Sequence, residues 1–186
     1  MKTYSQAPDA EGHVEKMRAS HHEELEGVTI APLFVFDSEE SSLSVLKHGG
    51  YWAAATMRIT PLKDRALGIA DAQIVIDRAC WAKYSARQRN ALVDHELTHL
   101  TRKIDKETGE MVTDALDRPK LILRKHDHQF GWFDEVAQRH GEHSIEVQQA
   151  RRLVEISGQL YFDFSAPPAT PPKRERKVAD RADLNG

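Results

Sequence analysis

The stretch that decides the fold is SARQRNALVDHELTHLTRK, residues 85–103. Ser85 and Gln88 have the spacing of a capping box, which predicts that a helix starts here. Apolar residues at positions 91, 92, 97 and 100 then give the predicted helix a side that can be buried. The centre of the stretch is HELTH, so His95 and His99 stand four positions apart on one face of that helix.

The histidine spacing points to a metal site. Side chains four apart on a helix can offer two imidazole nitrogens to one ion at about 2.0–2.1 Å, and zinc is the metal that best suits them. Glu96 borders the same face, where it can act as a general base on a water molecule at an open coordination position. The chain has ten histidines, so a chance match is the alternative. The capped amphipathic context favours the metal site.

A catalytic zinc site needs a third protein ligand, and the sequence offers three candidates downstream. We favour His126, which lies at the turn before a helix that Asp127 is predicted to cap. Asp127 can also orient an imidazole as a hydrogen-bond acceptor behind the metal. His128 is the second choice and Glu135 the third. A glutamate ligand would define a different subclass of zinc peptidase from a histidine ligand.

Two segments carry a family resemblance: ALVDHELTHL (91–100) and KHDHQFGWFDEVAQRHG (125–141). Together they resemble the SprT-like zinc metallopeptidases, and most closely the metallopeptidases encoded by bacteriophages. In those proteins the H-E-x-x-H motif follows Ala-Leu-hydrophobic-Asp, and a third histidine precedes an aromatic residue by four positions, as His126 precedes Phe130 here. The resemblance covers roughly residues 28–141. A single cysteine, Cys80, cannot build the zinc ribbon that many SprT-like proteins carry.

The resemblance implies an activity as well as a fold. It implies hydrolysis of peptide bonds by a metal-activated water molecule, with Glu96 as the general base. The substrate that it implies is a protein bound to or crosslinked with DNA. The alternative is a catalytically silent zinc-binding platform that recruits a replication partner. The presence of Glu96 counts against this alternative, because a purely structural site has no need of a base.

The resemblance also implies a small α+β domain of the zincin type, with a short sheet packed on the HELTH helix and on a following helix, and the pattern of the remaining sequence fits this layout. Three stretches have the apolar patterns of strands: 28–37, 51–60 and 71–77. Pro32 suits an edge strand or a bulge better than an inner position. Helices are also predicted at 11–28, from Asp127 to a stop at Gly141, and from 144 to an end at Gly158.

The last part of the chain offers two partner hypotheses. Four residues resemble the hexapeptide by which bacterial proteins bind the sliding clamp, although leucine is usual at the third position: Gln159, Leu160, Phe162 and Phe164. The alternative is that the aromatic residues pack on the core as a final strand. From residue 165 the sequence is Pro-rich and polar, which predicts a disordered tail at 165–186 after a domain at 1–164 with its core at about 28–141. The basic KRERK (173–177) predicts at most a weak DNA contact.

Composition and charge limit the possible location and partners of the protein. The net charge is −3, which argues against a domain that binds nucleic acid over much of its surface. No apolar run approaches the roughly 18 residues of a membrane span, and the start of the chain lacks the apolar core of a signal peptide. With a single cysteine, the sequence predicts a cytoplasmic protein, in the bacterial host cell if a phage encodes it.

Overall fold

The computed structural model describes residues 1–40, 42–127 and 131–163, with side chains described as far as residue 155. The chain divides into two compact units, Met1–Arg151 and Arg152–Gly186. Within the first unit a small sheet packs against helices, which confirms the predicted α+β class. No helix in the described part of the chain is both long and apolar enough to cross a membrane.

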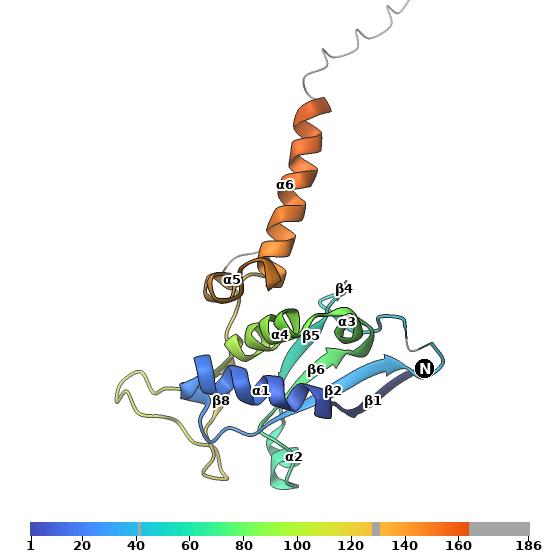
Figure 1. Cartoon of the computed structure of the whole chain (residues 1–186). Helices are drawn as coiled ribbons and strands as arrows, with labels where there is room; N and C mark the ends of the chain where they lie inside the picture. The colour runs from blue at the N-terminus through green and yellow to red at the C-terminus, as the bar shows by residue number, and fades with distance from the viewer. Residues whose placement is uncertain (41, 128–130, 164–186) are drawn as a thin grey trace, which may run out of the picture. The chain divides into compact units, whose positions relative to one another are not determined.

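The sheet of the first unit has four strands in the order β1-β2-β6-β5 (Figure 1). Their bounds are β1 Lys2–Gln6, β2 Ile30–Asp37, β6 Ala72–Asp77 and β5 Ala55–Ile59. Strands β1 and β5 run antiparallel to their neighbours, whereas β2 and β6 are parallel to each other. The strands predicted at 28–37 and 71–77 are confirmed. The stretch 51–60 divides into β4, Tyr51–Trp52, and β5, and the sequence did not predict β1.

Pro32 lies in an inner strand, contrary to the edge or bulge predicted for it, because β2 lies between β1 and β6. Strand β1 ends at Gln6, which pairs with Leu33, so Pro32 lies just past the end of β1. The Pro32 carbonyl accepts a hydrogen bond from the backbone N–H of Ala7 at 3.1 Å. The missing N–H of Pro32 points to this same side, where β1 has already ended, so no ladder bond is lost.

Helices α1 (Pro8–His21), α3 (Arg78–Lys83) and α4 (Ala86–Thr98) cover one face of the sheet (Figure 1). Alternate strand residues such as Phe34, Ile74 and Ile76 point into the core between the sheet and these helices. Val35 and Val75 point to the opposite face, where they pack with Leu46. The main hydrophobic core therefore lies between the sheet and α4.

Helix α4 starts as the sequence predicts. The Ser85 hydroxyl accepts a hydrogen bond from the Gln88 amide at 3.3 Å, and the Gln88 side chain accepts one from the Ser85 amide at 2.9 Å. Every residue from 91 to 98 is buried, the polar ones included. A helix this deeply enclosed must provide each of its polar side chains with a partner.

The elements that follow α4 differ more from those that the sequence predicts. After α4 come β7 (Leu100–Arg102), β8 (Leu121–Leu123), α5 (Asp134–His140), η2 (Gly141–His143) and α6 (Ile145–Asp163). Helix α5 starts at Asp134, not after Asp127, and Asp127 instead forms an ion pair with Arg124 at 2.6 Å. The predicted stop at Gly141 is confirmed, with φ at 51°. The predicted end of the last helix at Gly158 is wrong, because α6 continues to Asp163.

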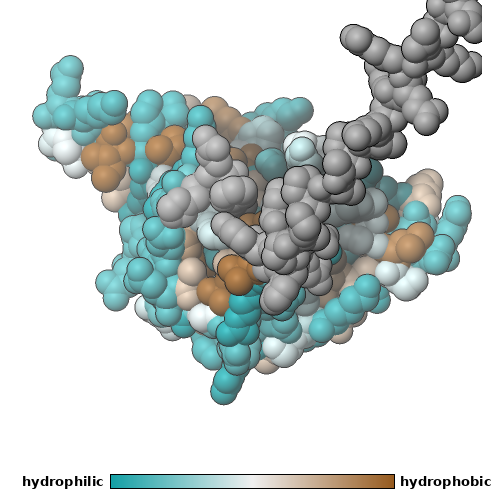
Figure 2. Space-filling model, turned by 90° about the horizontal axis from the view of Figure 1, so that it is seen from above, coloured by the Kyte–Doolittle hydropathy of each residue, from teal (hydrophilic) through white to brown (hydrophobic). Residues whose placement is uncertain are grey.

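The smaller elements are η1 (Glu23–Leu25), α2 (Leu62–Ala66) and a hairpin of β3 (Lys47–His48) with β4. Figure 2 shows that the face seen from above is mostly hydrophilic, with hydrophobic residues in small, separated patches. This pattern is ordinary for a folded domain, since many apolar atoms always stay exposed.

A buried carboxylate ties three distant segments together. Asp71 is 1% exposed and accepts hydrogen bonds from the Thr29 amide at 2.8 Å and from Arg65 Nε at 2.8 Å. Arg118, from the excursion between β7 and β8, reaches the same carboxylate at 2.6 Å. Burial alone would raise the pKa of Asp71, but the hydrogen bonds from Thr29, Arg118 and Arg65 outweigh it and lower the pKa.

We expect Asp71→Asn to lower the free energy of unfolding by about 3 kcal/mol, because buried Arg65 and partly buried Arg118 lose a carboxylate partner and Arg65 keeps only Asp114. Urea unfolding measures this, and Asp117→Asn, at an exposed residue with φ of 56°, is the matched control. Because the folded-state pKa is lowered, the stabilisation is present above the ordinary carboxyl pKa and is lost as the pH falls through the folded value. Equal stability of wild type and variant at neutral pH would contradict this.

Candidate metal centre

Three histidines meet at the end of α4. His95 lies in its last turn, His99 is the residue directly after its end, and His126 follows β8. One nitrogen from each ring lies within 4.8 Å of the other two, and Nε2 of His95 is 3.3 Å from Nε2 of His126. The ring centroids of His99 and His126 are 4.4 Å apart. The structure thus brings together the three residues that the sequence favours as ligands.

The spacing of these nitrogens fits a tetrahedral metal ion. Nitrogen ligands at about 2.0–2.1 Å from a tetrahedral ion are about 3.3–3.4 Å from one another. The observed separation of the Nε2 atoms of His95 and His126 is 3.3 Å. Neutral imidazoles suit zinc and other divalent transition metals. The residues present therefore fit a metal with nitrogen ligands.

The pairing of β7 with β8 brings His126 to α4. β7 begins directly after His99, and Leu100 pairs with Leu123. The Arg124 amide, at the end of β8, donates to the backbone carbonyl of His99 at 2.6 Å. The long excursion between the two strands therefore does not displace the third histidine, because the ladder returns the chain to the end of α4.

His99 is held in one tautomer. Its Nδ1–H donates to the backbone carbonyl of Arg124 at 2.9 Å, which leaves Nε2 as the lone-pair nitrogen. Burial is the main cause that lowers the pKa of His99 to about 4, and the neighbouring His95 and His126 add to this lowering. Burial also lowers the pKa of His126. Both rings are therefore neutral at neutral pH, as metal ligands must be.

His95 is held by Glu146, a residue that the sequence reasoning missed. Its Nδ1–H donates to Glu146 Oε1 at 2.7 Å, and Glu146 is 2% exposed. Burial opposes a charge on His95, but Glu146 and the nearby Glu96 outweigh it and raise the pKa of the ring. A carboxylate behind a ligand histidine fixes the ring orientation and increases its basicity. In the sequence Glu146 is an acidic residue at the start of the last predicted helix, and no local pattern signals this role.

Phe133 packs against all three histidine rings. Its ring centroid is 5.1 Å from that of His95, 4.8 Å from His99 and 4.9 Å from His126, and the residue is fully buried. The sequence pattern pointed to Phe130 as the aromatic partner of His126, but Phe130 lies outside the described residues. Gly131 has φ of 80°, and a Cβ there would lie 3.5 Å from the His126 ring. This turn lets the chain pass closely behind the histidine.

Glu96 is buried beside the histidines, 4% exposed. Burial raises its pKa to about 7, while His95 and the backbone of Met57 on β5 favour its charged form. A carboxyl with a pKa near neutrality can both accept and release a proton at working pH, which is what general acid–base catalysis requires.

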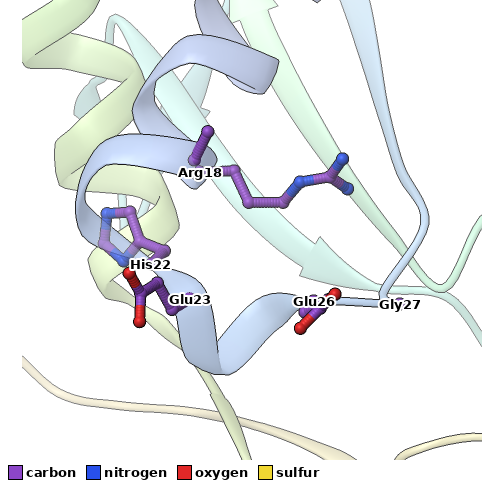
Figure 3. Close-up of a pocket in the computed structure, with 6 residues that line it drawn as sticks. Arg18, His22, Glu23, Glu26 and Gly27 are labelled. Carbon is purple, nitrogen blue, oxygen red and sulfur yellow. The ribbon is translucent and has the colours of Figure 1, made fainter.

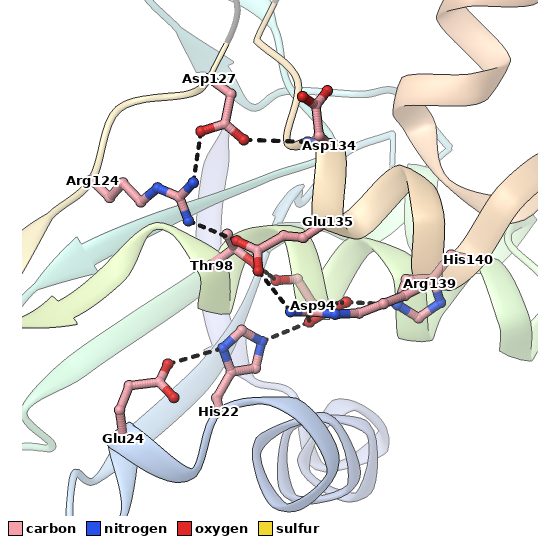
Figure 4. Close-up of polar contacts among 10 residues, drawn as sticks. All are labelled: His22, Glu24, Asp94, Thr98, Arg124, Asp127, Asp134, Glu135, Arg139 and His140. Carbon is pink, nitrogen blue, oxygen red and sulfur yellow. Dashed lines mark hydrogen bonds and ion pairs between the residues drawn. The ribbon is translucent and has the colours of Figure 1, made fainter.

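Asp94 joins three helices behind the site (Figure 4). Its carboxylate, which is fully buried, accepts a hydrogen bond at 2.6 Å from Nε2 of His22, the residue directly after α1, and one at 2.8 Å from Nε2 of His140 on α5. Arg139 Nη1 completes the cluster at 3.0 Å. Burial would raise the pKa of Asp94, but these partners lower it well below its usual range. The aspartate of the ALVDHELTHL segment therefore fixes α1 and α5 against α4.

A series of ion pairs leads from Asp94 to Asp127, the residue that follows the third histidine in the sequence (Figure 4). Arg139 also contacts Glu135 at 2.8 Å, Glu135 contacts Arg124 at 2.6 Å, and Arg124 contacts Asp127 at 2.6 Å. Glu135, the third-choice ligand, is thus engaged by two arginines and is not part of the histidine cluster. Among the contacts of Asp127 are Arg124 and the Asp134 amide at 3.3 Å. An orienting role of Asp127 toward His126 stays a prediction.

The other predicted site residues lie in parts of the chain that the structure describes only in part or not at all. His128 and Phe164 lie outside the described residues, as does the tail at 165–186. Gln159, Leu160 and Phe162 belong to α6, in the part whose side chains are not described. A clamp contact and a DNA contact of the tail therefore stay predictions.

A separate cavity of about 310 Å³ lies where α1 meets η1 (Figure 3). Its lining consists of Arg18, Ala19, His22, Glu23, Glu26 and Gly27, so it includes none of the three histidines. Both signs of charge line it, and His22 is already bonded to Asp94.

Comparison with known proteins agrees with this geometry. Residues 2–155 match the model of a family described as "Putative phage metallopeptidase". No curated protein and no solved structure matches the chain. The match spans most of the 186 residues and includes all three histidines and Glu96. The chain therefore belongs to the phage metallopeptidase family, whose members are named for metal-dependent peptide hydrolysis.

Proposed function

We propose that the protein is a zinc-dependent peptidase of the H-E-x-x-H type. In this proposal His95, His99 and His126 hold the metal and Glu96 is the general base. The observation that carries it is the convergence of three imidazole nitrogens within 4.8 Å of one another beside a buried carboxyl. Membership of the family supports a metallopeptidase. Three nitrogen ligands favour zinc over the harder cations, which prefer oxygen ligands.

Different residues of the protein have different roles in the proposed reaction. A divalent metal bound by the histidines supplies the Lewis acidity that makes water nucleophilic at neutral pH. Glu96 takes a proton from the attacking water at a carboxylate oxygen and passes it to the leaving amine nitrogen. Glu146 keeps His95 in the tautomer whose Nε2 is a ligand, and the Arg124 carbonyl does the same for His99.

Two finer aspects of the proposal rest on sequence alone. The SprT-like character is supported by the Ala-Leu-Val-Asp-His-Glu-Leu-Thr-His segment, and it suggests a protein associated with DNA as the substrate. Recruitment to a replication partner through residues 159–164 is supported only by the clamp-like pattern. Assays with and without DNA, described below, address the first of these.

We expect the purified protein to hold zinc in equimolar amount and His126→Ala to lose it, as His95→Ala does, because two histidines alone do not retain a catalytic zinc. Elemental analysis after dialysis against a weak chelator measures this. His128→Ala and Glu135→Gln are the matched variants of the rival ligands, and both should keep the metal. Metal retained by His126→Ala but lost by His128→Ala would assign the third ligand to His128 instead.

We expect Glu96→Gln to lower the rate of polypeptide cleavage by about 10²–10⁴-fold while the bound metal is kept, because the amide cannot accept the proton. The measurement is cleavage of an unfolded protein substrate, with and without single- and double-stranded DNA. Glu107→Gln, at an exposed residue, should behave as wild type. Equal rates for wild type and Glu96→Gln on every substrate would favour the silent platform.

We expect Glu146→Gln to weaken metal binding by about 10–100-fold, because a neutral amide behind His95 makes the ring a poorer ligand. Competition with a fluorescent zinc chelator gives the dissociation constant. Glu142→Gln, four residues earlier and with an exposed side chain, is the control. An unchanged dissociation constant for Glu146→Gln would show that the Glu146–His95 contact serves folding alone.

A further inference from the structure

His126 reaches the metal centre on a short loop, whereas His95 and His99 belong to the end of α4. The loop begins at Arg124, directly after β8, and the amide of the next residue after His126, Asp127, donates to the Trp132 carbonyl at 3.0 Å. A ligand on a loop is held less precisely than one on a helix. The position of the third histidine therefore depends on what anchors the residues on either side of it.

The backbone of Arg124 anchors the chain before His126. Its carbonyl accepts from His99 Nδ1–H at 2.9 Å, and its amide donates to the His99 carbonyl at 2.6 Å. These two bonds fix the backbone two residues before the third histidine. They leave the dihedral angles of the next residues free, because each residue has two soft backbone torsions. A second anchor after His126 is needed to fix the direction of its ring.

The Arg124 side chain supplies this second anchor (Figure 4). Its Nη2 lies 2.6 Å from Oδ1 of Asp127, the residue directly after His126, and its Nη1 lies 2.6 Å from Oε1 of Glu135 on α5. A planar guanidinium fixes the directions of two carboxylates at once, which a single ammonium group cannot do. The same guanidinium lies 5.1 Å from the centroid of the Phe133 ring, which packs on the three histidines. One residue thus holds the chain on both sides of the third ligand.

The α5 partner of this anchor is itself braced against α4. Glu135 also contacts Arg139 at 2.8 Å, and Arg139 contacts buried Asp94 of α4 at 3.0 Å. From Asp94 the contacts therefore run through α5 to Arg124 and return to the end of α4 at His99 (Figure 4). A closed series of contacts that starts and ends on one helix fixes the loop relative to the two ligands of that helix.

The exposure of these side chains separates positioning from stability. Arg124 is 39% exposed, Glu135 40% and Asp127 29%. Ion pairs this exposed contribute little to the free energy of unfolding, because water screens the charges. Their effect on a bound metal is larger, since groups that orient metal ligands change metal affinity by about 10–100-fold. Metal affinity is therefore the property through which this anchor can be recognised.

We propose that Arg124 is a positioning residue of the metal centre, whose ion pairs with Asp127 and Glu135 hold His126 where a metal requires it. Arg124 acts through these two carboxylates and contacts neither the metal nor the substrate. A third ligand that is held in place before the metal arrives has less conformational freedom to lose on binding, which raises the affinity. This inference rests on the proposed function, which makes the three histidines the metal ligands.

The test measures the zinc dissociation constant of the full-length protein by competition with a fluorescent chelator. We expect Arg124→Met, which keeps an apolar side chain but no charge, to weaken zinc binding about tenfold. Arg124→Lys restores the charge but not the fork, so it should weaken binding only about threefold. Arg151→Met, which breaks an exposed ion pair with Glu142, is the matched control and should equal wild type.

Urea unfolding of the metal-free proteins tells positioning from support of the fold. We expect the same unfolding midpoint for Arg124→Met and Arg151→Met. An unchanged zinc dissociation constant in Arg124→Met would overturn the proposal, whether or not the unfolding midpoint falls.

A double-mutant cycle tests the path through Asp127. We expect Asp127→Asn to weaken zinc binding about tenfold, and Arg124→Met with Asp127→Asn to weaken it no further, because both changes remove the same contact. If Asp127 instead orients the His126 ring directly, the two effects multiply to about 100-fold. That result would refute the anchoring of Asp127 through Arg124.

These measurements are separate from the test of the peptidase function, because they follow zinc binding and not cleavage. A wild type that binds zinc but cleaves nothing, together with a tenfold weaker Arg124→Met, would refute the peptidase and support the anchor. Cleavage by wild type with equal zinc affinities for wild type and Arg124→Met would do the reverse. A wild type that binds no zinc would overturn both.

Discussion

The structure depends on the burial of three consecutive polar residues near the C-terminal end of α4. Asp94, His95 and Glu96 lie in a helix segment that is enclosed throughout. Successive helix positions point about 100° apart, so the three side chains face three directions. A buried polar or charged group without a partner costs several kcal/mol. Each of these residues therefore requires a partner from a different part of the fold.

The surrounding elements supply those partners one by one. Asp94 is bonded to His22, directly after α1, and to two residues of α5. His95 is bonded to Glu146 of α6, and Glu96 contacts the backbone of β5. The arrangement of the helices around α4 thus satisfies the polar groups that the site needs. In this view the requirements of folding and of metal chemistry coincide, since the same contacts that remove unpaired charge also orient the ligands.

The locally encoded part of the site could be predicted from the sequence, and the rest could not. The spacing of His95 and His99 and the capping box at Ser85 follow from helix geometry alone, and both hold. His126 was favoured because of its place before an expected helix, which in fact starts only at Asp134. What brings His126 to the site is the register of β7 with β8.

The missed residues share a physical cause: their partners are distant in sequence. No local pattern indicates that Glu146 meets His95, or that His22 is buried against Asp94. No local pattern indicates either that Phe133 packs on the three rings. The length of α6 was underestimated because a glycine inside a helix costs only about 1 kcal/mol, which the rest of the helix can outweigh.

Anomalous diffraction from crystals of the zinc-loaded protein, recorded on both sides of the zinc absorption edge, tests the central claim most directly. The account predicts one strong peak at the end of α4, about 2.0–2.1 Å from the Nε2 atoms of His95, His99 and His126, with the Glu96 carboxyl beside it and not bound to it. A peak elsewhere, or one completed by Glu96, Glu135 or His128 in place of His126, would contradict it.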